Sequence, residues 1–378
     1  MKTVIILGAG RVGAVIARDL NDNPNIQVTV ADRRSELLDH IASQMQCETI
    51  CDDFSKPDTV KKVVDDFDLA IGALPGPMGL NFIKGAIAAK KPCVDISFTK
   101  QDPEILDDDA KASGIPVLYD FGIAPGMSNL LAAASINEIE SAKQLRILVG
   151  GLPTIRRPPW EYAAPFSPID VMEEYTRPAR IRINNQNVER KPLSGVEEIK
   201  FPEVGTLEAF YTDGLRSLLR NCKCPAMEEK TLRYPGHAAH ITLLRDSGFL
   251  GRDPVDINGI KIAPIDFTLR MLEPVWHLDH MAEEFTIMRI TVVGGEPPVY
   301  NRIEWNLLDR TDRTKNETSM ARTTGFPAAI AATKILDGTL NIAPGVHPPE
   351  SLATDSKFID SLLSGLEARD VIYRKTVA

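Results

Sequence analysis

The sequence predicts an α/β protein built on a doubly wound parallel sheet, with a second α+β domain inserted before C-terminal helices that return to the first domain. Short apolar strands alternate with amphipathic helices over residues 1–124, and longer strands separated by turn signals follow. Helical patterns resume near residue 320. We therefore expect a first domain of residues 1–124 and 320–378, a second domain of residues 125–319, and a cleft between them.

Composition limits the classes of function. The chain of 378 residues is long enough for two domains with separate cores. A formal net charge of −9 argues against nucleic acid or an anionic membrane as a partner. The apolar runs are shorter than the roughly 18 residues of a spanning helix, and the N-terminal run does not resemble a signal peptide. Five irregularly spaced cysteines fit reduced thiols, so we expect a cytoplasmic protein.

Three glycines follow the first strand. The apolar run Val4–Leu7 leads into the spacing G-x-G-x-x-G, after which apolar residues recur at helical intervals. The first glycine makes a tight turn, the second lets backbone approach a pyrophosphate, and the third lets the helix pack on the strand. This pattern predicts a Rossmann domain that binds a dinucleotide at a helix N-terminus. The residues expected to form the cradle are Gly8, Ala9, Gly10, Arg11, Val12 and Gly13.

The second strand, Ile26–Ala31, bears on the choice of cofactor because Asp32 stands at its end. A carboxylate there can accept hydrogen bonds from both ribose hydroxyls of NAD and would repel the 2′-phosphate of NADP. Arg33 and Arg34 act in the opposite direction, since a guanidinium can accommodate that phosphate. We predict NAD, with NADP less favoured, and include Arg33 among the cofactor-binding residues.

The remaining strands of the first domain are expected at residues 48–51, 68–73, 92–96 and 115–119, with helices between them. The third strand leads to Asp52, which we assign to the cofactor site. The fourth leads to Ala73, Leu74 and Pro75. In a doubly wound sheet this last loop lies beside the glycine loop across the switch point, so it should flank the dinucleotide.

The second domain shows a different pattern. Strands are expected at residues 144–149, 179–183, 285–293 and 302–308, and helices at 213–219 and 236–247. They predict a mixed or largely antiparallel sheet with helices on one face. An apolar sheet face there favours a homodimer. Helices at 319–336 and 355–367 would then close onto the first sheet.

Several stretches resemble the saccharopine dehydrogenase-like family, over nearly the whole chain and in the family's order. They are Gly122-Ile123-Ala124-Pro125-Gly126-Met127-Ser128-Asn129, Gly150–Pro153, Phe166-Ser167-Pro168, Thr231–His237 and Ser319–Gly325. Within the family the chain is most similar to lysine 6-dehydrogenases, through Ala124, the stretch Leu207–Leu215 and His237. Saccharopine reductases carry an aspartate in place of Ala124 and usually prefer NADP. The resemblance implies NAD-dependent oxidation of the ε-carbon of L-lysine to 2-aminoadipate 6-semialdehyde and ammonia.

This chemistry needs a general base, because hydride leaves an amine carbon only when the nitrogen lone pair is free. His237 is the candidate, since imidazole titrates near working pH; its alternative is a structural histidine at a helix N-terminus. Asp95 and Asp120 follow strand ends, where open α/β sheets bind ligands. They could hold the substrate amine or serve in turns. A carboxylate stabilises ammonium and opposes its deprotonation, so positioning suits them better than base catalysis.

Substrate binding is assigned to the family-like motifs. An amino acid's carboxylate favours a two-pronged arginine, and Arg233 is the choice, with a surface ion pair as its alternative. Tyr234 lies in the same motif, and Arg322 could contact cofactor or substrate. The loop that starts at Gly122 should approach the nicotinamide. Its neighbours Met127 and Asn129 complete the predicted set.

The sequence also allows other interpretations of its metal-binding capacity and function. The pairs His237/His240 and His277/His280 and the pair Cys222/Cys224 do not have the spacing of a common structural zinc site, so no metal is predicted. A rival enzyme would be a saccharopine or carboxynorspermidine dehydrogenase, which acts on a secondary amine. A rival of another class would be a non-catalytic NAD-sensing protein.

Overall fold

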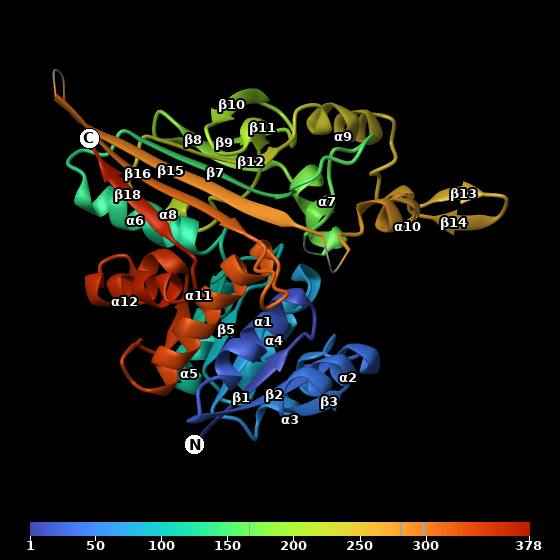
Figure 1. Ribbon diagram of the computed structural model, residues 1–378, viewed down its shortest axis with the longest axis vertical. Helices are drawn as coiled ribbons and strands as arrows, with labels where there is room; N and C mark the ends of the chain where they lie inside the picture. The colour runs from blue at the N-terminus through green and yellow to red at the C-terminus, as the bar shows by residue number, and fades with distance from the viewer. Residues whose placement is uncertain (166, 280–281, 297–298) are drawn as a thin grey trace. The chain divides into compact units, whose positions relative to one another are not determined.

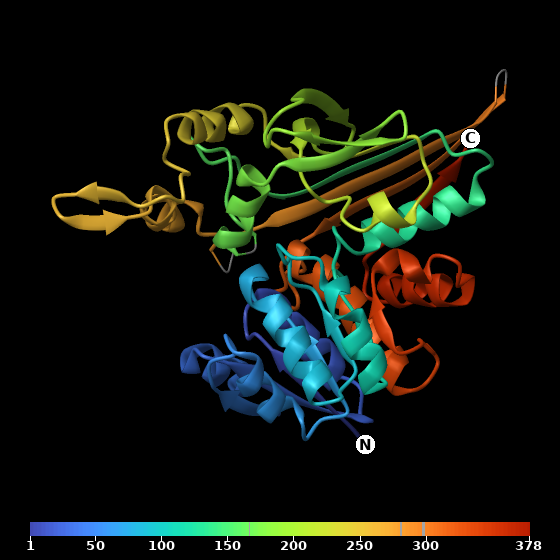
Figure 2. The same cartoon turned by 180° about the vertical axis from the view of Figure 1, so that it is seen from behind.

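The computed structural model describes residues 1–165, 167–279, 282–296 and 299–378. The chain divides into two compact units. Unit 1 contains Met1–Asn137 and Ala321–Ile372, and unit 2 contains Glu138–Met320 and Tyr373–Ala378. The return of the C-terminal helices to the first unit agrees with the predicted fold class (Figures 1 and 2). Three boundaries differ from expectation, because residues 125–137 belong to unit 1, while Met320 and residues 373–378 belong to unit 2.

Unit 1 is built on a parallel sheet with the strand order β17-β6-β5-β4-β1-β2-β3. Its strands are β1 (Lys2–Leu7), β2 (Ile26–Asp32), β3 (Glu48–Cys51), β4 (Leu69–Gly72), β5 (Cys93–Asp95), β6 (Pro116–Leu118) and β17 (Gly345–His347). The order reverses at β1, which lies between β2 and β4. This is the switch point beside which doubly wound sheets bind ligands.

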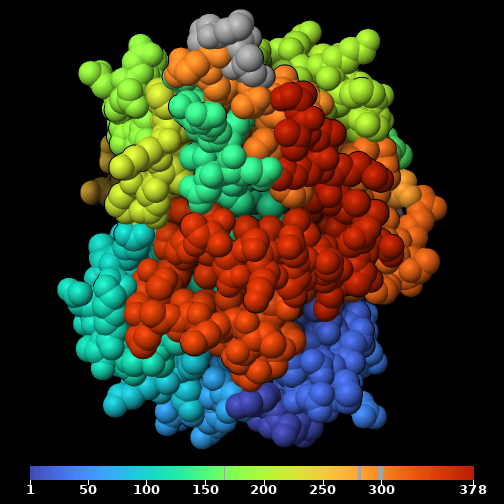
Figure 3. Space-filling view, turned by 90° about the vertical axis from the view of Figure 1, so that its left-hand side faces the viewer, coloured from blue at the N-terminus to red at the C-terminus, as the bar shows by residue number. Residues whose placement is uncertain are grey.

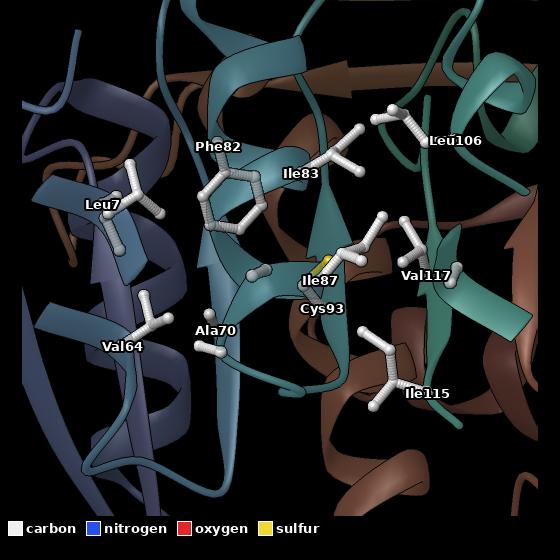
Figure 4. Close-up of a cluster of buried hydrophobic side chains, with 14 of the residues drawn as sticks. Leu7, Val64, Ala70, Phe82, Ile83, Ile87, Cys93, Leu106, Ile115 and Val117 are labelled. Carbon is white, nitrogen blue, oxygen red and sulfur yellow. The ribbon is translucent and has the colours of Figure 1, made fainter. Parts of the chain in front are cut away.

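The helices of unit 1 cover this sheet. They are α1 (Arg11–Asn21), α2 (Ser35–Gln44), α3 (Pro57–Val64), α4 (Gly76–Ala88), η1 (Pro103–Leu106), α5 (Asp107–Ser113), α6 (Met127–Glu138), α11 (Ser319–Leu336), η2 (Pro349–Leu352) and α12 (Ser356–Glu367). Figure 4 shows Phe82 and Ile83 of α4 in the same apolar cluster as Leu7 and Ala70 of the sheet. Burial of such side chains is the main force that holds helices onto a sheet.

The returning segment is tied to unit 1 by specific contacts. Asp355 caps α12, because its side chain accepts a hydrogen bond from the Phe358 amide at 3.0 Å. Arg369 pairs with Asp19 of α1, with Nη2 3.0 Å from Oδ2. Strand β17 pairs with β6 in parallel. In Figure 3 the side chains of this segment, which are coloured orange-red to red, form one continuous band on the surface.

Unit 2 contains a mixed, mostly antiparallel sheet with the path β10-β11-β12-β7-β15-β16-β18. Its strands are β7 (Gln144–Pro153), β8 (Ala179–Ile183), β9 (Gln186–Arg190), β10 (Glu197–Phe201), β11 (Gly205–Tyr211), β12 (Ala226–Arg233), β15 (Glu284–Glu296), β16 (Val299–Arg310) and β18 (Tyr373–Val377). Strands β12 and β7 are parallel, and β8 and β9 join the sheet beside β12. A separate hairpin is formed by β13 (Val255–Ile257) and β14 (Ile260–Ile262).

The helices of unit 2 are α7 (Pro168–Thr176), α8 (Leu218–Asn221), α9 (His237–Asp246) and α10 (Pro264–Trp276). The helix predicted at residues 213–219 is wrong, because only α8 forms there. Asp213 instead receives hydrogen bonds from Arg180, and Arg216 has a left-handed φ of 50°. None of the helices in the described ranges is both long and apolar enough to cross a membrane.

Candidate nucleotide and substrate sites

The glycine cradle has the close approaches that its motif requires. Gly8 has a φ of +114°, and its amide donates to the Ala31 carbonyl at 2.7 Å. A Cβ added at Gly8 would lie 2.2 Å from the Ala73 carbonyl oxygen, and one at Gly13 would lie 1.8 Å from that of Gly8. Only glycine fits at these two positions, because real Cβ atoms do not approach backbone so closely.

The second glycine differs from the other two. A Cβ added at Gly10 would meet no atom of the described residues within 4 Å. Gly10 is also the N-cap of α1, which opens with Arg11 and Val12. Open space beside first-turn amides at the positive end of a helix dipole suits a pyrophosphate. The residues present therefore fit the dinucleotide that the spacing predicts.

Asp32 is already engaged by its neighbours. Its Oδ1 accepts from the backbone amide and Nε of Arg34, each at 3.0 Å. Its Oδ2 accepts from Ala9 N at 2.8 Å and from Arg34 Nη2 at 2.9 Å. Burial raises the pKa of Asp32, but these bonds outweigh it and hold the pKa below its usual value. Both oxygens expected to receive ribose hydroxyls thus have protein donors.

The other predicted cofactor residues follow the carboxyl ends of β2, β3 and β4. The Asp52 amide donates to the Asp32 carbonyl at 3.3 Å, and the Arg33 carbonyl accepts from the Cys51 thiol. Ala73 donates its amide to Leu7 at 2.8 Å, directly after β4. Leu74 and Pro75 continue this loop, and Pro75 is the N-cap of α4.

Two buried aspartates stand at the carboxyl ends of β5 and β6. Ser97 Oγ donates to Asp95 Oδ1 at 2.9 Å. Burial raises the pKa of Asp95 well above its usual value, and the negative charge of Asp120 raises it further, although hydrogen bonds from Ser97 act against both. Asp120 is 2% exposed and has a φ of +53°. Strained backbone of this kind in a residue other than glycine is concentrated at functional sites.

The loop after Asp120 closes on itself. A Cβ at Gly126 would lie 2.0 Å from the Gly122 carbonyl oxygen. That oxygen accepts from the Met127 amide at 2.9 Å, and Asn129 Oδ1 accepts from Ser128 Oγ at 2.7 Å. The structure therefore gathers the predicted residues Gly122, Met127 and Asn129 into one tight turn beside Asp120. Its compactness explains Gly126, whereas a Cβ added at Gly122 would lie 3.0 Å from Thr324 Cγ2 of α11.

Arg233 lies in the interior of unit 2 and not on its surface. Its Nη2 is 2.6 Å from Glu174 Oε2, and its Nε donates to the Tyr175 hydroxyl at 3.2 Å. The guanidinium also lies over the Tyr162 ring, with Cζ 4.6 Å from the centroid. Burial opposes its charge, but Tyr162, Tyr175 and Glu174 raise the pKa of Arg233. Arg233, which was predicted to donate hydrogen bonds to the substrate carboxylate, thus sits in a buried ion pair with Glu174.

His237 lies in the same cluster. Its Nδ1 is 2.8 Å from the Trp160 carbonyl and its Nε2 is 2.8 Å from the Tyr175 hydroxyl. Burial and the charge of Arg233 lower the pKa of His237 to about 3. The ring is therefore neutral, Nδ1–H donates to the carbonyl, and Nε2 accepts from the tyrosine. In this arrangement both ring nitrogens of His237 have partners among the described residues.

Glu208 fixes the position of His237. This role was not predicted from the sequence. Its carboxylate accepts from the amides of Gly236, at 2.9 Å, and Ala238 at the start of α9. A carboxylate stabilises a helix N-terminus by meeting its free amides and its dipole. Glu174 and Tyr175 were also missed, because their partners come from distant parts of the chain.

The remaining predicted residues lie elsewhere. The Tyr234 hydroxyl donates to the Pro153 carbonyl at 2.9 Å. Arg322 donates from Nη2 to the Arg369 carbonyl at 2.8 Å, within unit 1. Among the residues described, no three of the types His, Cys, Asp and Glu gather as a metal site would require. Of the histidine pairs considered, His280 falls outside the described residues.

Comparison with known proteins identifies the family. Residues 4–118 match the saccharopine dehydrogenase NADP binding domain, and residues 122–372 match the saccharopine dehydrogenase C-terminal domain. The chain belongs to the saccharopine dehydrogenase family. It is therefore a family oxidoreductase with a pyridine-nucleotide-binding domain, and the predicted family resemblance is confirmed.

Relatives of this family member include saccharopine dehydrogenase [NADP(+), L-glutamate-forming] of Saccharomyces cerevisiae, 25% identical with 100% of both chains covered. The Pyricularia oryzae protein of the same name is 33% identical over 40% of this chain and 35% of its own. Rat alpha-aminoadipic semialdehyde synthase is 25% identical over 50% of this chain but only 21% of its own. The structure of the apo yeast saccharopine dehydrogenase shares the fold, with a TM-score of 0.82 at 20% identity over all of both chains.

The cradle leads to a first prediction. Gly13→Ala should destabilise the protein by at least about 1–3 kcal/mol, because its Cβ would overlap the Gly8 carbonyl. Gly10→Ala should change the free energy of unfolding by less than about 0.5 kcal/mol, yet weaken nucleotide binding. Denaturant unfolding and NADPH titration of both variants measure the two effects. Equal stability losses would contradict the assignment.

A second prediction concerns Glu229 on β12. It accepts from Thr212 Oγ1 at 2.6 Å, and burial raises its pKa from 4.5 to about 8. A raised carboxyl pKa contributes stability that is complete below pH 4.5 and is lost as the pH rises to about 8, by at most about 1.4 kcal/mol per pH unit. Glu229→Gln should escape this loss.

The Tm difference between Glu229→Gln and wild type should therefore grow between pH 5 and 8 and then level off, as measured by differential scanning calorimetry. Glu198→Gln, at an exposed position on β10, is the matched control and should track wild type. A difference that stays constant with pH would contradict the raised pKa.

Proposed function

We propose that this chain oxidises the ε-carbon of L-lysine with a pyridine nucleotide, giving 2-aminoadipate 6-semialdehyde and ammonia. The observation that carries the proposal is the carboxyl edge of the unit 1 sheet. The glycine cradle, the strained Asp120 and the tight turn from Gly122 to Gly126 all follow strands of this one sheet. The carboxyl edge is where open α/β sheets bind ligands.

The chemistry follows from the substrate nitrogen. A proton must leave the ammonium before hydride leaves the ε-carbon, and the C–N bond then gains double-bond character. When bound, the pyridine nucleotide supplies the hydride acceptor. Water adds to the iminium carbon and ammonia leaves, so lysine with its ammonium group, oxidised nucleotide and water become semialdehyde, an ammonium ion, one proton and reduced nucleotide.

Asp95 and Asp120 suit the task of holding the amine. The charge of Asp120 is one reason why the Asp95 carboxyl favours its protonated form. A cationic amine next to the pair would offset the repulsion between the two carboxylates. We assign Asp120 to bind the amine and Asp95 to position it.

Two observations favour lysine over a larger substrate. Saccharopine carries three carboxylates and lysine one, so saccharopine needs more cationic partners. In unit 2 the basic side chains Arg233, Arg180 and Arg177 already pair with Glu174, Asp213 and Glu173. The alignment to the yeast enzyme also runs over 455 positions against 378 residues here, so that enzyme has insertions relative to this chain.

Saccharopine oxidation is the second candidate. It is favoured by the printed name of the yeast relative, which this chain matches over its full length. That reaction also breaks a C–N bond by hydride removal, so the two candidates differ in substrate and not in the type of step.

We assign His237 a positioning role in place of the expected role as base. Its two ring nitrogens face Trp160 and Tyr175, so it orients the Tyr175 hydroxyl beside Arg233. A base acting directly would need its free nitrogen within reach of the substrate proton.

A third prediction tests the reaction. The purified full chain should form reduced nucleotide at alkaline pH with lysine faster than with ornithine, saccharopine or carboxynorspermidine. Asp120→Asn should lower kcat/KM for lysine by about 10–100-fold, as expected for the loss of a hydrogen bond to a charged amine. Asp108→Asn, at an exposed position on α5, should leave it unchanged.

The same assay checks His237. His237→Gln should reduce the rate but keep the acid limb of the pH profile, whereas loss of that limb would restore His237 as the base. Turnover of saccharopine without turnover of lysine would replace the proposed substrate by the second candidate.

We also propose that the chain accepts NADP as well as NAD, and that Arg34 sets the ratio. The predicted preference for NAD rested on a free Asp32 carboxylate. Asp32 instead holds the Arg34 guanidinium, whose side chain remains 55% exposed. A guanidinium at the end of the second strand can bind a 2′-phosphate. The matching domain and the yeast relative both carry NADP in their names.

The fourth prediction follows. Arg34→Ala should raise KM for NADP at least about 10-fold, in line with the loss of a hydrogen bond to a charged group, and leave KM for NAD within about 2-fold. Lys61→Ala, which removes one positive charge at an exposed position on α3, is the matched control and should leave both KM values unchanged. Equal changes for both nucleotides would contradict the role of Arg34.

A further inference from the structure

The hairpin of β13 and β14 has one apolar face. Its register pairs Val255 with Ile262, Ile257 with Ile260, and Asp256 with Lys261. Directly opposite residues share a face and successive residues alternate between faces. The four aliphatic residues therefore lie on one face, and the two charged residues on the other. Figures 1 and 2 show the hairpin projecting beyond α10, clear of the other elements of unit 2.

Helix α10, which follows the hairpin, adds an apolar stripe. Phe267, Met271 and Val275 recur every four residues on its exposed side. The opposite side of the helix is buried through Ile265, Leu272 and Trp276. The arm patch is defined as this stripe with the exposed hairpin residues, Val255, Ile257, Ile260, Phe267, Met271 and Val275. Each of these side chains is between 46% and 63% exposed.

The arm patch is large for an uncovered apolar surface. An isolated two-stranded hairpin is at best marginally stable alone, so its apolar face needs a cover. Six large side chains at about half exposure leave on the order of 600 Å² of apolar surface, the upper end of patches on monomers. A stable dimer needs about 800 Å² from each partner. The patch supplies most of that area.

The charges around the arm patch indicate which kind of partner binds it. Asp256 lies opposite Lys261 on the hairpin, and Arg270 pairs with Glu273 on α10 at 3.0 Å. Acidic and basic side chains are thus both present around the patch, and the chain as a whole has a net charge of −9. An anionic membrane or nucleic acid needs a basic surface. A second copy brings the same balanced set, which a two-fold contact can match to itself.

We infer that two copies of this chain associate through their arm patches, with the hairpin of one copy lying on the α10 stripe of the other. The contact is isologous, so each copy supplies a hairpin and receives one. Its apolar centre lies between the charged pairs, as in interfaces with an apolar core and a polar rim. This assembly surface does not depend on the proposed reaction.

The fifth prediction tests it by sedimentation velocity on the full chain over a range of concentrations. Wild type should be a dimer, and Ile257→Lys with Ile260→Lys should raise the dimer dissociation constant at least 100-fold. Met271→Lys on the helix should act in the same direction, which keeps the test valid if the hairpin variant loses its local structure. Asp256→Asn, which changes the net charge by +1 as Met271→Lys does but lies on the other hairpin face, should leave the constant within 3-fold.

Circular dichroism and NADPH binding report on the fold of each variant. A monomeric wild type at all concentrations would overturn the inference, as would a dimer that Met271→Lys and the hairpin variant leave intact. Flotation with anionic phospholipid vesicles tests the other cover. If wild-type monomers bind these vesicles and the patch variants do not, the patch binds a membrane, and the inferred association of two copies is overturned.

Discussion

The steric closure of the first turn constrains everything else in unit 1. Gly8 and Gly13 bring α1 against the end of β1, and Gly8 also touches the loop that follows β4. These contacts join both sides of the switch point and leave Gly10 facing open space. A side chain at either close position would separate the helix from the strand, and the amides of the first turn would no longer converge on one point. The nucleotide site therefore depends on two missing Cβ atoms.

Unit 2 places its charge in the interior, where the energetics differ. Removing water from Arg233 and Glu174 is costly, and their attraction offsets the cost only because Tyr162 and Tyr175 complete the hydrogen bonding. His237 contributes to this network as a neutral ring. Such networks are cooperative, so loss of one member leaves others unsatisfied. The cluster joins α7, α9 and β12 through the hydrogen bonds of Tyr175, His237 and Arg233.

Much of unit 1 could be predicted from sequence because its signals are local. The alternation of strands and helices, the glycine spacing and the acidic end of β2 are each contained within a few residues. The pairing of Asp32 with Arg34 was not foreseen, because the choice between a ribose and a guanidinium depends on side-chain geometry. Strand β17 was missed since its short run gains its pairing only from β6. In unit 2 the partners of His237 lie 62 and 77 residues away.

The backbone crosses between unit 1 and unit 2 three times. The backbone passes between them at residues 137/138, 320/321 and 372/373. The last passage adds β18 to the edge of β16, where it supplies the hydrogen bonds that an open edge would otherwise offer to other chains. Neither unit is a continuous stretch of sequence. A single recombination point therefore cannot exchange one unit for that of a homologue, and such an exchange needs a crossover at each of these three passages.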